Sequence, residues 1–188
     1  MLDYFPYSEK ENPKVSYVKG PSQKGGAPDL KNKSFGISAV VEIPEDGAEG
    51  MLMTQGGRFA GLGLYLLESQ PVFHYNLCGV ERYTVAGKDK LLPRKHVVAV
   101  DFNYDGGGVG KSGQATLTVD GKQVASEKLP QTIAFRMSLD ETLDIGEDTG
   151  TPVSEDYQVP FKFTGHLEKV TIKITEKKLT EEQLRQYR

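Results

Sequence analysis

Apolar and polar residues alternate along most of this chain, and this period of two restricts the fold more than any other feature of the sequence. From Ser34 to Pro44, apolar side chains occupy every second position. That spacing places them on one face of a β-strand, which the proline then ends. The apolar positions of this segment and of six similar ones are Phe35, Ile37, Ala39, Val41 and Ile43; Leu62, Leu64 and Leu66; Phe73, Tyr75 and Leu77; Val98, Val100, Phe102 and Tyr104; Ala115, Leu117 and Val119; Ile133, Phe135, Met137 and Leu139; and Val170, Ile172 and Ile174.

Turn-forming residues separate these segments. The chain contains 21 glycines and 10 prolines, which is typical of a β protein with many short turns. Asp120-Gly121 lies between two alternating segments and is a strong hairpin signal. Strand and helix patterns do not alternate along the chain, which argues against an α/β enzyme fold. The pattern therefore predicts an all-β protein with about ten short strands in an antiparallel β-sandwich.

The two ends of the chain depart from this pattern. Residues 1–31 are predicted to be an extended leader with at most one short strand, around Val15–Val18, and residues 32–175 to be the sandwich domain. Thr180 followed by Gln183 is a capping box, which predicts about two helical turns up to Tyr187. Residues 176–188 are therefore predicted to be a short C-terminal helix.

Charge and composition exclude several classes of function. The formal net charge is −3, which argues against nucleic acid as a partner, because phosphate binding needs a concentrated basic face. No apolar run approaches the roughly 18 residues of a membrane span, and residues 1–10 lack the pattern of a signal peptide. A single cysteine, Cys78, excludes an internal disulfide and a thiolate metal cage. These features assign neither a compartment nor an oligomeric state.

Three long blocks, at residues 56–85, 102–126 and 144–174, carry a resemblance to a known family. They include GGRFAGLGLYLL, NLCGVERYTV, FNYDGGGVGKSG and DIGEDTGTPVSEDY. From Asn32 to Ile174, the chain resembles the C-terminal region of large bacterial arylsulfatases, with the blocks in the family's order. The resemblance implies a jelly-roll sandwich like those of concanavalin A-type lectins and laminin G modules. The chain departs from the family's pattern at two places. Ala60 stands where the family usually has a second glycine, and the segment LESQP lacks the family's usual Asp-Gly turn.

The resemblance also implies a parent sulfatase whose catalytic domain precedes Met1, but the catalytic chemistry does not carry over. A sulfatase needs a Cys-x-Pro-x-Arg type motif and a carboxylate-rich metal site. Cys78 is followed by Gly79 and Val80, so the proline is missing. We therefore expect a non-catalytic accessory domain whose partner is the sulfatase catalytic domain of the same polypeptide. The alternatives are a free-standing lectin-like carbohydrate-binding module and an endo-acting glycosidase.

The acidic run DETLDIGEDTG suggests two kinds of site. Glu141, Asp144 and Glu147 are three residues apart, so a strand would place Asp144 opposite the other two, which argues against a glycosidase pair. A calcium site would draw on these carboxylates, because calcium prefers oxygen ligands from loops. The favoured alternative is a solvated acidic loop whose Asp side chains cap their own turns. We expect the domain to require no cofactor. The candidate calcium ligands, of which at least one is expected to meet an arginine or a cation, are Asp140, Asp144, Asp148 and Asp156.

Two side chains are candidate ligand contacts. Arg58 could reach a sulfated or anionic sugar, or equally pair with a carboxylate inside the domain. Tyr75 could stack on a sugar from a concave face, although packing in the core is the simpler role. The glycine-rich segment 105–113 resembles a phosphate loop, but a strand pattern follows it where a phosphate loop needs a helix, so a hairpin turn is predicted.

Overall fold

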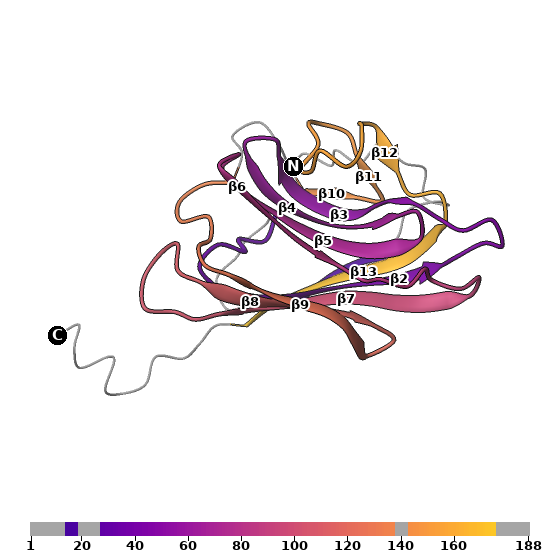
Figure 1. Cartoon of the computed structure of the whole chain (residues 1–188), viewed down its shortest axis with the longest axis horizontal. Helices are drawn as coiled ribbons and strands as arrows, with labels where there is room; N and C mark the ends of the chain where they lie inside the picture. The colour runs from indigo at the N-terminus through magenta and orange to yellow at the C-terminus, as the bar shows by residue number, and fades with distance from the viewer. Residues whose placement is uncertain (1–13, 19–26, 138–142, 176–188) are drawn as a thin grey trace.

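The computed structural model describes residues 14–18, 27–137 and 143–175, and these residues form two β-sheets packed face to face (Figure 1). In order across the first sheet, the strands are β1 (Lys14–Val18), β13 (His166–Thr175), β2 (Ser34–Glu42), β7 (Lys95–Tyr104), β8 (Gly113–Val119) and β9 (Lys122–Leu129). The second sheet contains β11 (Glu147–Asp148), β12 (Phe161–Lys162), β3 (Gly50–Gly57), β4 (Ala60–Leu67), β5 (Gln70–Leu77) and β6 (Glu81–Ala86), and β10 (Leu143–Ile145) pairs with β3.

The predicted all-β sandwich is confirmed. Most neighbouring strands are antiparallel, while β1–β13 and β12–β3 are parallel pairs. No helix occurs among the described residues, and the helix expected up to Tyr187 lies outside them. The described part of the chain therefore contains no helix that is long and apolar enough to cross a membrane.

Alternation places the core where the sequence predicted it. In β2 and β7, every second side chain is buried and faces the opposing sheet. Phe35 and Phe102 are register partners and stack with ring centroids 5.1 Å apart. Tyr75 from the second sheet stacks on Phe102 at 6.2 Å. Aromatic contacts of this kind join the two sheets across the core.

Two-residue turns join β4 to β5 and β8 to β9, and the second is the Asp-Gly hairpin that the sequence predicted. Asp120 and Gly121 both have positive φ, 51° and 76°, which is the type I′ conformation expected for an Asp-Gly hairpin between β8 and β9. The β4–β5 turn also has two positive φ angles, although it contains no glycine: Glu68 and Ser69 adopt φ of 48° and 67°. The Ser69 hydroxyl accepts a hydrogen bond from the Ala48 amide at 2.9 Å. The missing Asp-Gly pair in LESQP is therefore a variation in turn chemistry only.

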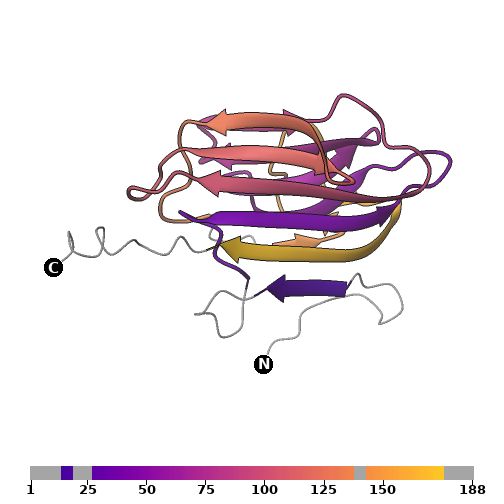
Figure 2. The same cartoon turned by 90° about the horizontal axis from the view of Figure 1, so that it is seen from below.

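The leader is not entirely separate from the sandwich. The strand predicted around Val15–Val18 is confirmed as β1, which lies beside β13 at the edge of the first sheet (Figure 2). Leu30 is 2% exposed and belongs to the core. Residues 27–30 therefore pack on the sandwich just before the predicted domain boundary at residue 32.

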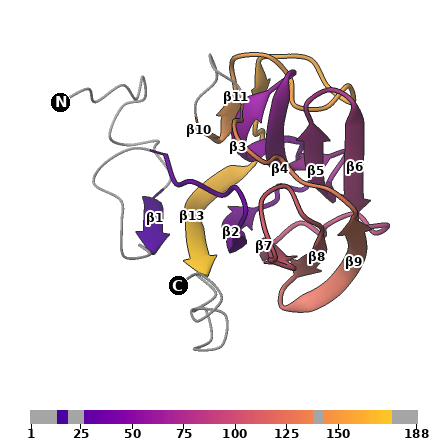
Figure 3. The ribbon, with the colours of Figure 1, turned by 90° about the vertical axis from the view of Figure 1, so that its left-hand side faces the viewer.

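The strand predicted over Ile133–Leu139 is wrong as far as the structure describes it, because residues 131–137 form no strand. Their backbone groups bind loops and side chains instead of a β-ladder: the Thr132 amide donates to the carbonyl of Gly110 (3.3 Å) and the Ile133 amide to the Tyr75 hydroxyl (3.0 Å). The segment crosses one end of the sandwich from β9 in the first sheet toward β10 in the second (Figure 3).

Candidate ligand-binding rim

Five segments meet at the end of the sandwich that residues 130–137 cross, and we call them together the rim. They are residues 27–33, 57–60, 78–80, 105–112 and 130–137. The turns 57–60 and 78–80 belong to the second sheet, and the loop 105–112 joins β7 to β8 in the first, as a hairpin connection rather than a phosphate loop. Hydrogen bonds between these segments fix the backbone of the rim.

Asn76 holds the second-sheet side of the rim. Its side chain is fully buried, and its Nδ2 donates to the carbonyls of Gly57 (3.1 Å) and Arg58 (2.8 Å). Its Oδ1 accepts from the Gly79 amide at 2.8 Å. One buried amide therefore fixes two neighbouring turns, because all of its bonds go to backbone groups of those turns. The hydroxyl of the adjacent Tyr75 accepts a hydrogen bond from the Ile133 amide, which attaches residues 130–137, the crossing segment, to the second sheet.

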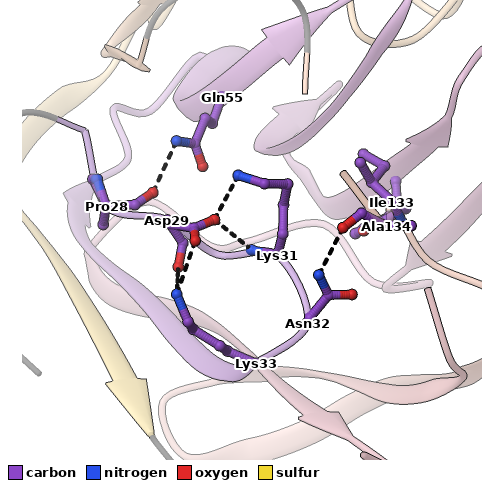
Figure 4. Close-up of polar contacts among 9 residues, drawn as sticks. Pro28, Asp29, Lys31, Asn32, Lys33, Gln55, Ile133 and Ala134 are labelled. Carbon is purple, nitrogen blue, oxygen red and sulfur yellow. Dashed lines mark hydrogen bonds and ion pairs between the residues drawn. The ribbon is translucent and has the colours of Figure 1, made fainter. Parts of the chain in front are cut away.

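Asn32 holds the first-sheet side in a similar way. Its Nδ2 donates to the carbonyl of Ala134 at 2.7 Å (Figure 4), and its Oδ1 accepts from the Gly110 amide at 2.7 Å. The Tyr104 hydroxyl accepts from the Lys111 amide at 2.9 Å. The crossing segment is thus bonded to both sheets, and its side chains project from a fixed backbone.

Residues 27–33 are braced by an acidic side chain. Asp29 forms ion pairs with Lys31 (2.6 Å) and Lys33 (2.9 Å), and Gln55 Nε2 donates to the carbonyl of Pro28 at 2.9 Å (Figure 4). Burial raises the pKa of Asp29, but hydrogen bonds from the two lysines outweigh it and lower the pKa to about 2. Both lysines therefore share one carboxylate that is ionised at neutral pH, which leaves one net positive charge on the three side chains.

Exposed apolar side chains gather on the rim. Within residues 27–137 and 143–175, seven large hydrophobic side chains are exposed, and four of them belong to the rim: Phe59 (71%), Val80 (83%), Val109 (53%) and Phe135 (81%). The other three, Leu92, Val97 and Val124, lie toward the opposite end, near the β8–β9 turn. Two phenylalanines on a fixed backbone are therefore open to a ligand at one end of the molecule.

The structure separates the two predicted ligand contacts. Arg58 is exposed on the rim, where its amide donates to Thr151 Oγ1 at 2.9 Å. Its guanidinium forms no ion pair within the described part of the chain, so the internal carboxylate partner considered for it is not found. Tyr75 is 2% exposed and packs in the core. Its ring has no face open to a ligand.

The predicted calcium ligands do not converge. Asp140 lies outside the described residues, and no group of three metal-binding side chains occurs within them. Hydroxyl groups occupy the others: Asp144 accepts from Thr149 Oγ1 (2.8 Å), and the buried Asp148 accepts from the Tyr157 hydroxyl. The hydroxyl partners of these carboxylates could not be read from the spacing of the acidic run.

Residues 149–160, between β11 and β12, form the segment that covers the outer face of the second sheet, and Asp156 anchors it. It accepts hydrogen bonds from Tyr65 Oη (2.9 Å) and Ser154 Oγ (2.7 Å). Burial is the main cause that raises the pKa of Tyr157, and the neighbouring Asp148 raises it further. Burial and the neighbouring Asp156 likewise raise the pKa of Tyr65. Both phenols are therefore protonated donors at neutral pH, which keeps the segment attached to the sheet.

His74 lies on the outward side of β5, on the same face as Tyr65. It is 3% exposed, its Nδ1 bonds Thr84 Oγ1 at 2.8 Å, and its Nε2 is buried without a partner in the described structure. Burial lowers the pKa of His74 to about 4, and Arg82 adds to this, while Asp156 and Glu155 oppose it. The imidazole is therefore neutral at pH 7.

Comparisons with known proteins agree on the fold. No protein-family model and no curated protein sequence matches the chain. Among solved structures, it is similar to the LG1–3 region of the laminin α2 chain (TM-score 0.57, 14% identity, covering 82% of this chain and 31% of that chain). It is also similar to domains LG4–5 of the mouse laminin α1 chain (TM-score 0.53, 17% identity, 81% and 39%).

A third similar structure is a protein from Bacteroides ovatus to which carbohydrate binding is ascribed (TM-score 0.52, 18% identity, 86% of this chain and 42% of that chain). The chain spans less than half the length of each of these three chains. At such identities the likeness concerns the fold alone. The chain thus has a jelly-roll β-sandwich fold similar to that of laminin G domains, as the resemblance implied.

Proposed function

We propose that this chain is a non-catalytic carbohydrate-binding module whose ligand site is the rim. The observation that carries the proposal is the pair of exposed phenylalanines, Phe59 and Phe135, on hydrogen-bonded segments at one end of a lectin-like sandwich. The apolar C–H face of a sugar ring packs on an aromatic face, and a fixed backbone reduces the entropy lost on binding. The similarity to the Bacteroides ovatus protein supports the same ligand class.

Phe135→Ala should weaken polysaccharide binding at least tenfold, which corresponds to about 1.4 kcal/mol of binding free energy. The ring is 81% exposed on the crossing segment, so its removal takes away contact area and leaves the core intact. Isothermal titration against a panel of soluble polysaccharides measures the affinity.

Leu92→Ala is the matched control, because Leu92 is also an exposed apolar side chain (65%) but lies toward the opposite end. It should leave the affinity unchanged. Equal affinity of the parent chain, Phe135→Ala and Phe59→Ala for a polysaccharide that binds would move the site away from the rim. If no polysaccharide binds the parent chain, the proposed function is wrong.

A second candidate function is accessory domain of an arylsulfatase-like hydrolase, packed against that enzyme's catalytic domain. The observation that favours it is the resemblance of the blocks at residues 56–85, 102–126 and 144–174, two of which supply rim segments. Reading the gene upstream of Met1 tests it. A Cys-x-Pro-x-Arg or Ser-x-Pro-x-Arg motif in frame would support the accessory role, and an in-frame stop codon with no such motif would oppose it.

The chain by itself should not hydrolyse an aryl sulfate such as nitrophenyl sulfate. Neither the nucleophile motif nor a cluster of carboxylates suited to a metal is found in the described residues. Absorbance of released nitrophenol, compared between the chain and buffer, measures the rate. Hydrolysis above the buffer rate that disappears in Cys78→Ser would contradict the proposal.

A further inference from the structure

Each exposed phenylalanine of the rim is next to an exposed arginine in the sequence. Arg58 precedes Phe59 in the β3–β4 turn, and Arg136 follows Phe135 on the crossing segment. Lys111 is a third exposed cation, at the end of the loop 105–112, where its carbonyl accepts from Thr132 Oγ1 at 2.7 Å. The rim therefore combines apolar rings with positive charge on both of its sides.

None of these three cations is neutralised within the described structure. Arg58, Lys111 and Arg136 form no ion pair, and their side chains have no hydrogen-bond partner among the described residues. Charges on neighbouring segments reinforce one another, because screening at physiological ionic strength extends over about 8 Å. The rim thus presents uncompensated positive charge to a ligand.

Two acidic side chains near the rim form ion pairs with cations outside it. Asp105 pairs with Lys128 at 2.5 Å and accepts from Ser112, and Glu155 pairs with Arg82 at 3.1 Å. Glu81 accepts from the Tyr83 hydroxyl. Asp105 and Glu155 are therefore balanced by cations of their own, whereas Glu81 keeps its charge, because its partner is a neutral phenol.

Three cations toward the opposite end differ in this respect, although Lys88 and Lys122 there form no ion pair within the described residues. Arg94 pairs with Asp120 at 3.0 Å, Lys95 with Glu168, and Lys90 with Glu68 at 3.6 Å. Because an internal carboxylate already occupies each of these cations, they have less to gain from an external anion. Unpaired cations next to exposed rings are a feature of the rim.

Building on the proposed carbohydrate-binding function, we propose that the rim selects acidic polysaccharides, whose sulfate or carboxylate groups bind Arg58 and Arg136 while their sugar rings pack on Phe59 and Phe135. Guanidinium groups suit this role, because they bind sulfate or carboxylate oxygens through two parallel N–H donors. Lys111 supplies a point charge beside them. The charge of the rim therefore determines the ligand class.

Titration calorimetry with dextran sulfate and with unmodified dextran tests the proposal, since the two share one sugar backbone. Dextran sulfate should bind at least tenfold more tightly than dextran, with an affinity that falls as salt rises. The double variant R58Q/R136Q should lose at least tenfold in affinity for dextran sulfate. Arg94→Gln should have no such effect, because Arg94 is an exposed arginine that is already paired and lies at the other end.

Polygalacturonate and polyglutamate complete the comparison. Polygalacturonate carries carboxylates on sugar rings and should bind more tightly than dextran, whereas polyglutamate has charge without rings and should bind more weakly than polygalacturonate. Equal binding of polyglutamate and dextran sulfate would overturn the inference in favour of simple ion exchange. Equal binding of dextran and dextran sulfate, with a loss in Phe135→Ala, would overturn the inference and leave the proposed function intact.

Discussion

Gly56→Ala should lower the free energy of unfolding by about 2 to 5 kcal/mol, as the sum of backbone strain and a steric clash. Gly56 has φ +81°, a left-handed conformation that side chains other than glycine rarely adopt. A Cβ added there would lie 2.2 Å from the carbonyl oxygen of Ala60 and 2.9 Å from the Cα of Gly61. Both contacts are with backbone, so no side chain can rotate away and the β3–β4 ladder would have to separate.

Gly106→Ala is the matched control for this variant. Gly106 has φ +82°, but a Cβ added there would meet nothing within 4 Å. It should therefore show the backbone strain alone, about 1 to 2 kcal/mol. Urea titrations of both variants give the two free energies. Equal losses would mean that the contact with Ala60 adds no free energy and that the ladder yields without resistance.

The strands that sequence patterning could predict are those with one buried face. β2 and β7 bury every second side chain against the opposing sheet, so their apolar residues alternate and their positions are clear from the sequence. β3 shows no such alternation, and all but one of its side chains are buried. The segment that covers the outer face of the second sheet buries Met51 and Tyr65 there together with Val153 and Tyr157. Burial on both faces removes the signal that alternation supplies.

The sequence predicted only part of the candidate site, for a related reason. Arg58 could be identified because it lies in a recognisable block, but Phe135 looked like a core residue, since Ile133, Phe135 and Met137 follow the spacing of a strand. In the structure Ile133 and Met137 are buried and Phe135 is exposed, because the irregular backbone of the crossing segment turns its side chain outward. Pro130, just after β9, is the signal that the strand pattern is interrupted there.

Acid should destabilise this protein through His74. The folded state holds the pKa of His74 at about 4, mainly because the ring is buried, whereas an unfolded chain restores it to about 6.5. Between these two values the unfolded state binds more protons than the folded state, so stability falls as the pH decreases. The contribution is intact above pH 6.5 and is lost progressively down to pH 4. A difference of about 2.5 pKa units corresponds to a loss of about 3 kcal/mol.

His74→Gln removes this titration and keeps a polar side chain that can still bond Thr84. At pH 7.5 the variant should be less stable than the parent, because glutamine fills the site less well. The difference should shrink or change sign by pH 4.5, since only the parent chain then has to keep an imidazole neutral. Urea midpoints at pH 7.5, 5.5 and 4.5 give the slope for each protein.

His166→Gln is the control for general acid effects, because His166 is exposed and its replacement leaves the carboxylates unchanged. It should follow the parent's decline with pH. Parallel pH profiles for the parent chain and His74→Gln would show that His74 is protonated at little cost. The unpaired Nε2 would then have to gain an acceptor within the fold, and Asp156 is the carboxylate whose charge already favours the protonated ring.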